Sequence, residues 1–191
     1  MGREFELKFR AEEAQQEAIL AKFGAFDTIA METTYYDTPD RALSARRMTL
    51  RRRMENGLSV CTVKTPGKDG SRGEWEYPCE EITQAIRALC KLGCPEELKT
   101  LTSVGVSPLC GARFTRRAKE VTMADCTVEI ALDRGVLLGG GREIPLCEVE
   151  VELKSGEEAA AQAFAEALAR EFDLIPEEKS KFRRASDLVG E

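Results

Sequence analysis

The stretch EFELKF, residues 4–9, alternates charged and apolar side chains throughout its length. Glu4, Glu6 and Lys8 occupy every second position, with phenylalanine or leucine between and after them. A period of two is the period of a β-strand, so one whole face of this strand carries charge and the other is apolar. The apolar face needs a core to cover it, and the charged face needs either solvent or a charged ligand.

The same alternation recurs along the chain. In residues 147–154, Glu148, Glu150 and Glu152 alternate with cysteine, valine and leucine. One charged strand face is normally solvated, but a repeated set with acids and bases sorted by strand indicates an enclosed charged surface. Strand parity places these residues on it: Glu4, Glu6, Lys8, Arg10, Arg51, Arg53, Lys64, Arg72, Glu74, Glu76, Arg113, Arg117, Glu129, Asp133, Glu148, Glu150 and Glu152.

Turn and helix signals place these strands in an α+β fold. Residues 11–24, 80–93 and 157–172 have helical patterns, and Asn56-Gly57 between two strand patterns predicts a hairpin. Neighbouring strands are therefore expected to be antiparallel, within a single domain over residues 1–191. We predict that eight antiparallel strands close into a β-barrel, with the charges lining its lumen and the helices packed outside.

The composition excludes several classes of function. The chain has 191 residues, a net charge of -6 and no histidine, which argues against general nucleic-acid binding and against histidine-based catalysis. The seven cysteines lack the close spacing of a zinc site and are expected to be reduced and mostly buried. No signal peptide precedes the first strand and no apolar run approaches the ~20 residues of a membrane span, so we expect a cytoplasmic protein without membrane contact.

A lumen this rich in charge needs ligands of both signs. Packed carboxylates repel one another unless cations neutralise them, and carboxylate oxygens suit hard cations such as Mg²⁺ or Mn²⁺. The arginines and lysines of the other strands favour a polyanion. A phosphate chain with bound divalent metal would satisfy both sets.

Short motifs in a fixed order now indicate a family. They are E-x-E-x-K (4–8), YYDT (35–38), LRRR (50–53), TVK (62–64), RGEWE (72–76), EVEVEL (148–153) and SKF (180–182). In these motifs the chain resembles the CYTH domain, also called the triphosphate tunnel metalloenzyme family. The resemblance covers essentially the whole chain, and it implies an eight-stranded tunnel that binds triphosphate-containing substrates with divalent metal.

The resemblance also implies roles for individual residues. Glu4, Glu6, Glu150 and Glu152 correspond to metal ligands for Mg²⁺ or Mn²⁺, with Asp133 and Glu148 as supports. The phosphate clamp would comprise Lys8, Arg51, Arg53, Lys64, Arg72, Arg113, Arg117 and Lys181. Catalytic roles fall to Lys8, Glu150, Glu152 and Lys181, and supporting roles to Arg10, Glu74, Glu76 and Glu129. Between 113 and 117 three arginines compete, and parity alone selects Arg113 and Arg117 over Arg116.

Several activities are compatible with this resemblance. We expect hydrolysis of inorganic triphosphate (tripolyphosphate), because the predicted inward residues are nearly all charged and no aromatic set is evident for an organic group. The alternatives are a thiamine triphosphatase, a class IV adenylate cyclase, an RNA 5′-triphosphatase and a polyphosphate-binding module without turnover. The expected partner is a small triphosphate-containing molecule, bound by a monomer or homodimer.

Overall fold

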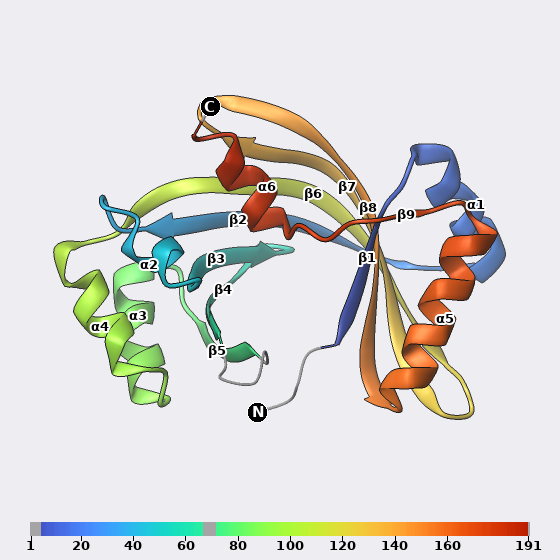
Figure 1. The fold of residues 1–191 in the computed structure, drawn as a ribbon, viewed down its shortest axis with the longest axis horizontal. Helices are drawn as coiled ribbons and strands as arrows, with labels where there is room; N and C mark the ends of the chain where they lie inside the picture. Colours follow the sequence, from blue (N-terminus) through green and yellow to red (C-terminus); the bar gives the residue numbers. More distant parts are fainter. Residues whose placement is uncertain (1–4, 67–71, 191) are drawn as a thin grey trace.

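The computed structural model describes residues 5–66 and 72–190. Its described strands form one antiparallel sheet, and its helices lie around that sheet (Figure 1). The strands are β1 (Glu6–Arg10), β2 (Asp27–Asp37), β3 (Thr49–Glu55), β4 (Leu58–Pro66), β5 (Arg72–Pro78), β6 (Ser107–Thr122), β7 (Cys126–Gly139), β8 (Arg142–Gly156) and β9 (Ile175–Pro176). The helices are α1 (Glu13–Phe23), α2 (Ala42–Ala45), α3 (Ile82–Lys91), α4 (Glu96–Leu101), the 3₁₀ turn η1 (Thr102–Val104), α5 (Glu158–Glu171) and α6 (Lys181–Asp187).

The sheet is curved but open. Its strand order is β5-β4-β3-β2-β6-β7-β8-β1-β9, nine strands within the described residues. Figure 1 shows β3, β4 and β5 curling beneath the arch formed by β2 and β6. The α+β class and the antiparallel pairing are confirmed, but the described strands number nine and do not close into the expected eight-stranded barrel. The ninth strand, β9, pairs with β1 at Phe9 and Arg10, at one edge of the open sheet.

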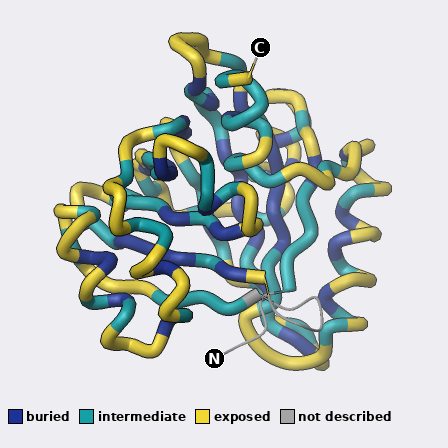
Figure 2. The backbone as a smooth tube through the Cα atoms, turned by 60° about the vertical axis from the view of Figure 1, so that its left-hand side comes forward, coloured by how far each residue is buried: buried dark blue, intermediate teal, exposed yellow. Residues whose placement is uncertain are grey.

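Two apolar layers cover the outer face of the sheet, defined here as the face opposite Glu150. Helices α1 and α5 pack on β1, β7 and β8 through a core that includes Ile19, Val149 and Leu168. Helices α3 and α4 pack on the β3–β5 end through Leu50, Val63 and other buried side chains. These layers bury the apolar faces that the period-two patterns predicted, and Figure 2 shows buried residues along the strands and a mixture of buried and exposed residues along the helices.

The short helix α6 is the exception, because it packs on the inner face. It contacts β6 and β7, and its Ala185 and Phe182 join a cluster with Tyr35 and Phe114. The β7–β8 turn approaches it closely, since a Cβ on Gly139 would lie 2.2 Å from the carbonyl oxygen of Ala185. The C-terminal segment is thus held against the same face that carries the charged residues.

All seven cysteines are free, as expected from their spacing, and four of them are buried. No helix in the described part of the chain combines the length and the apolar composition that crossing a membrane requires.

Candidate active site

A cavity of about 280 Å³ opens on the inner face of the sheet. Its lining residues come from strands that are far apart in the sheet order, because the curvature brings β3 and β4 round toward β1 and β8. They are Glu6, Lys8, Met31, Thr33, Tyr35, Thr49, Arg51, Arg53, Lys64, Phe114, Arg116, Glu150, Glu152, Ser180, Lys181 and Phe182. The structure thus brings together eight of the residues predicted from the sequence, whose chemical roles stay predictions: Glu6, Lys8, Arg51, Arg53, Lys64, Glu150, Glu152 and Lys181.

One wall of the cavity is basic. Strand parity along β3 and β4 turns Arg51, Arg53 and Lys64 inward, and β5 places Glu74 beside them. The Lys64 ammonium lies 3.2 Å from a Glu74 oxygen, and the Arg51 guanidinium lies 3.8 Å from the other. The buried Nε of Arg51 has no hydrogen-bond partner among the described residues. A buried donor without a partner is costly, which suits this wall to an anion with several acceptor oxygens.

Arg53 also lacks enough negative charge around it. It makes an ion pair with Glu55 at 2.5 Å, yet burial and the neighbouring Arg51 charge lower the pKa of its guanidinium. On β5, the Glu76 carboxylate accepts a hydrogen bond from the Thr62 hydroxyl at 2.9 Å and lies 3.9 Å from Arg51. Glu74 and Glu76 thus lie beside the basic wall, and the supporting role predicted for them stays a prediction.

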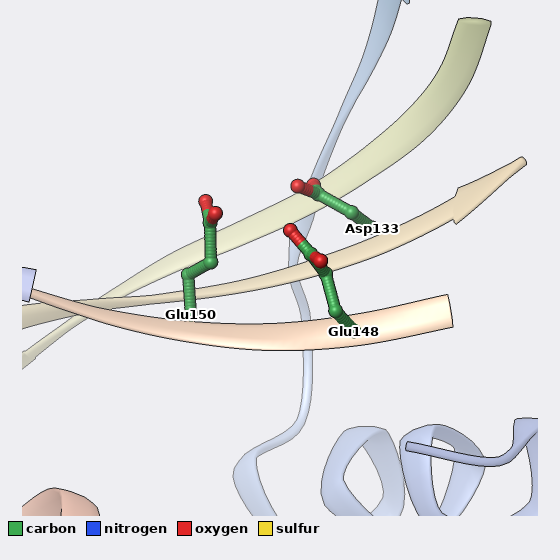
Figure 3. A group of neighbouring side chains, drawn as sticks. All are labelled: Asp133, Glu148 and Glu150. Atoms are coloured by element: carbon green, nitrogen blue, oxygen red, sulfur yellow. The ribbon is translucent and has the colours of Figure 1, made fainter. Parts of the chain in front are cut away.

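Behind the opposite wall lies a buried acid cluster of Asp133, Glu148 and Glu150. One oxygen from each carboxylate lies within 4.8 Å of the others, and Figure 3 shows the three groups gathered on one side of β7 and β8. Asp133 and Glu148 face each other across the β7–β8 ladder, which explains why residues distant in sequence meet here. A donor set of this kind could serve a hard divalent cation.

Three basic side chains balance this cluster. The Lys181 ammonium lies 2.7 Å from both Asp133 and Glu150 and also contacts Glu148. Arg116 donates two hydrogen bonds to Asp133, at 2.8 and 2.7 Å, and contacts Glu150. These cations outweigh the burial that opposes ionisation, so the pKa of Glu150 is held well below its usual range. The same carboxylates outweigh the effect of burial on Lys181 and raise the pKa of its ammonium.

The third cation is Arg184, one helical turn after Lys181, which contacts the second oxygen of Glu148. The formal charges of these three carboxylates and three basic groups sum to zero, although burial and the Glu150 charge raise the pKa of Glu148.

A second acid group on the inner face is less well balanced. Glu6 is the register partner of Glu152, which also faces Glu129 on β7. Glu6 accepts a hydrogen bond from Lys8 at 3.0 Å, but burial and the Glu150 charge still raise the pKa of its carboxyl group. Burial likewise raises the pKa of Glu129. Glu152 pairs with Lys154 at 3.3 Å, so these three carboxylates are paired with two lysines, Lys8 and Lys154. Carboxylate oxygens with this excess of negative charge could contribute ligands to a hard cation such as Mg²⁺ or Mn²⁺.

The prediction for β6 was wrong. Arg113 has a 62% exposed side chain that pairs with Glu143 at 3.3 Å, and Arg117 pairs with Glu17 of α1 at 3.8 Å, so both lie on the outer face. Arg116 takes the inner position instead. The prediction assumed that the face carrying the apolar Phe114 is the outer face. In the structure α6 covers Phe114 on the inner face, so Arg116, which shares that face, is turned inward.

The outer face of β2 and β6 explains why Arg113 can lie outside. Ala30, Glu32, Arg113 and Thr115 are exposed there, in the interval between the two helical layers. Without a helix to cover this part of the sheet, polar residues are stable on the outside as well, and alternation no longer distinguishes the faces.

Arg10, Asp133 and Glu148 were also predicted for the site but do not line the cavity. Arg10 has a 60% exposed side chain, pairs with Glu177 at 3.7 Å and does not line the cavity. Asp133 and Glu148 are fully buried behind the cavity wall. Glu4 lies outside the described residues, and for Arg72 only its place in β5 is described.

The sequence reasoning also missed an apolar wall. Met31, Tyr35, Phe114 and Phe182 all line the cavity. The rings of Tyr35 and Phe182 lie 5.0 Å apart between centroids, and the Lys181 ammonium lies 5.3 Å from the centroid of Phe114. The sequence analysis found no aromatic set for an organic group, whereas three aromatic side chains line this cavity. The sequence did carry one signal for this wall, because Met31 and Tyr35 lie on the same face of β2. Phe114 was not recognised as part of the wall, because the wrong face of β6 was predicted to point inward.

Comparisons with known proteins agree with this geometry. The family model described as the CYTH domain matches residues 2–186. The inorganic triphosphatase of Haemophilus influenzae is 32% identical over 169 residues, which cover 86% of this chain and 48% of that protein. The chain thus spans about half the length of that relative. Human thiamine-triphosphatase is 27% identical over 198 residues, covering 98% of this chain and 77% of that protein.

Solved structures show the same fold. A Bacillus halodurans protein described as a candidate adenylate cyclase superposes with a TM-score of 0.66 at 20% identity, covering 96% of this chain and 98% of that one. A Hippeastrum protein, described as a candidate adenylyl cyclase with a dominant triphosphatase activity, gives 0.62 at 18% identity, with 95% and 93% coverage.

Proposed function

Because the chain belongs to the CYTH family, the triphosphate tunnel metalloenzymes, we propose that it hydrolyses inorganic triphosphate to pyrophosphate and phosphate with Mg²⁺ or Mn²⁺. The observation that carries this proposal is the pairing of two unlike walls in one cavity. Arg51, Arg53 and Lys64 form a wall suited to phosphate oxygens, and Glu6 and Glu152 form a wall suited to a metal. The inorganic triphosphatase activity named for the Haemophilus influenzae relative supports the same choice of substrate.

In this proposal, basic side chains bind the phosphate groups. The guanidinium groups of Arg51 and Arg53 bind non-bridging oxygens, and the ammonium group of Lys64 adds a third positive charge. Lys8 lies on the acidic side of the cavity, where its ammonium bonds to Glu6 and its strand neighbour is Glu150. In this proposal it binds the phosphate that undergoes attack.

The metal would be held by Glu6 and Glu152, together with Glu4 in the same motif. When bound, Mg²⁺ or Mn²⁺ neutralises phosphate charge and lowers the pKa of a water molecule. The chain has no histidine, so a carboxylate would accept the proton of the attacking water, and Glu152 is better suited to this than Glu150, because the ion pairs that lower the pKa of Glu150 make it a weak base. Positioning and charge neutralisation supply most of the rate enhancement in phosphoryl transfer.

We also propose that the sheet closes into the tunnel of the family when the substrate binds. A phosphate chain that bridges Arg51 and Lys64 on one side and Lys8 on the other would offset the repulsion among these cations. It would draw the β3–β4 end of the sheet toward β1, and the predicted barrel would form around the substrate.

A second candidate function is the hydrolysis or cyclisation of an organic triphosphate. Met31, Tyr35, Phe114 and Phe182 favour it, because an apolar wall beside a phosphate clamp suits a base or a thiazolium ring. A polyphosphate-binding module without turnover would need the basic wall alone.

One panel separates these functions. The protein is incubated in ¹⁸O-labelled water with inorganic triphosphate, ATP or thiamine triphosphate and Mg²⁺ or Mn²⁺, and the products are identified by mass spectrometry. We expect inorganic triphosphate to be consumed fastest, with equal amounts of pyrophosphate and phosphate and the label in the monophosphate. Faster turnover of an organic triphosphate would favour the second candidate, with cyclic AMP identifying a cyclase. Binding without any product would leave only the binding module.

A further inference from the structure

Helix α1 carries a buried glutamine where its apolar contact with the sheet meets the charged side chain of Arg134. Gln16 is 2% exposed and lies beside Ile19 and other members of the core beneath α1 and α5. Its side-chain amide donates to the carbonyl oxygens of Asp133 at 3.1 Å and Glu148 at 2.9 Å. Its Oε1 accepts a hydrogen bond from Nε of Arg134 at 3.1 Å. Both donors and the acceptor are therefore used.

The two carbonyl groups belong to the residues whose carboxylates form the acid cluster. Asp133 and Glu148 are register partners on β7 and β8. Their side chains reach the inner face, where they hold Lys181, and Lys181 begins α6. One amide on the outer side of the sheet thus fixes the two backbone positions from which these acids project.

The side chain of Gln16 is itself held in place by Arg134. Arg134 lies next to Asp133 in the chain but points to the outer face, where it donates to Glu17 at 2.9 Å and contacts Glu13. A buried amide costs free energy unless its polar atoms are paired, and all three bonds are made here. Leucine of similar volume would remove a partner from two carbonyl oxygens and one guanidinium, so only an amide at this position joins Asp133, Glu148 and Arg134 to α1.

We propose that Gln16 is a positioning residue for the candidate active site. It sets the spacing of Asp133 and Glu148, and through their carboxylates it orients Lys181 and Arg116 at the cavity wall. The kinetic part of this inference rests on the proposed triphosphatase function, whereas the structural part does not.

The neighbouring glutamine offers a matched control. Gln15 also donates two hydrogen bonds to backbone carbonyls, those of Phe172 at 2.8 Å and Asp173 at 3.0 Å, and accepts one from the amide of Glu12 at 2.6 Å. It has the same chemistry and the same number of bonds as Gln16, but it connects α1 to the end of α5.

The test compares Gln16→Leu with Gln15→Leu in the full chain. We expect Gln16→Leu to raise the KM for triphosphate, or its Kd by calorimetry, by about tenfold, the lower end for an outer hydrogen-bond partner. We also expect faster hydrogen exchange of the α6 amides, residues 181–187, although no described contact joins Gln16 to α6. Gln15→Leu should change neither quantity beyond the change in global stability.

Equal effects of the two variants on α6 exchange, or a loss of global stability alone in Gln16→Leu, would overturn the proposal. If Gln16→Leu does not fold, Gln16→Met serves with the same expectations. If the wild-type protein does not act on triphosphates, the proposed function fails, but the exchange of α6 still decides the role of Gln16.

Discussion

Replacing Lys181 by methionine tests the balance of the buried acid cluster. Methionine keeps most of the apolar stem and removes only the ammonium. The carboxylates of Asp133, Glu148 and Glu150 then face Arg116 and Arg184 alone, and the net charge of the cluster falls from zero to minus one. Asp133 and Glu148 have fully buried side chains, so solvent cannot screen this charge.

The magnitude follows from this burial. Removing one partner from a buried, hydrogen-bonded ion pair costs about 3–5 kcal/mol, because the remaining charge stays buried without compensation. The Lys181 side chain is only 11% exposed, so the estimate needs no discount for a solvated lysine. For a domain of this size, about 4 kcal/mol corresponds to a fall in Tm of roughly 8–16 °C.

The assay is urea unfolding followed by the fluorescence of Trp75, the only tryptophan, with a thermal scan beside it. Lys179→Met is the matched control, because its side chain is 59% exposed and makes one ion pair, with Asp187 at 3.0 Å. We expect the control to lose no more than about 0.5 kcal/mol. A free energy of unfolding for Lys181→Met within about 1 kcal/mol of the wild type would refute the reasoning, since the cluster would not depend on this ammonium.

Three further outcomes are expected. Arg53→Ala should weaken triphosphate binding in calorimetry by about 2–5 kcal/mol, whereas Arg52→Ala, on the opposite face of β3, should change it by less than about 0.5 kcal/mol; equal losses would contradict the assigned faces. Glu6→Gln should lower Mn²⁺ affinity measured by electron paramagnetic resonance, and exhaustive chelation should abolish turnover of the wild type; full activity after chelation would exclude a metal role. Arg116→Ala should reduce both stability and triphosphate affinity, and Arg113→Ala neither; the reverse would restore the original assignment on β6.

The strands with one covered face could be predicted from the sequence. Val149 and Val151 must be buried, so Glu150 between them has to point to the other face. The same rule placed Glu6 and Lys8 on β1 and Arg51 and Arg53 on β3. The prediction holds wherever an outer helical layer makes one face apolar, because strand alternation is a local property that needs no knowledge of distant partners.

Only the tertiary structure decided what lies on the inner face. Arg116 rather than Arg113 lines the cavity, because α6 covers Phe114 from inside while the outer surface of β6 has no helix over it. The family resemblance implied that Lys181 belongs to the phosphate clamp, and this role stays a prediction, but only the fold shows that its ammonium lies 2.7 Å from both Asp133 and Glu150, which balance its charge in this structure. Alternation determines which side chains share a face, but the side chains that meet across a curved sheet depend on contacts between segments far apart in the chain, which no local pattern encodes.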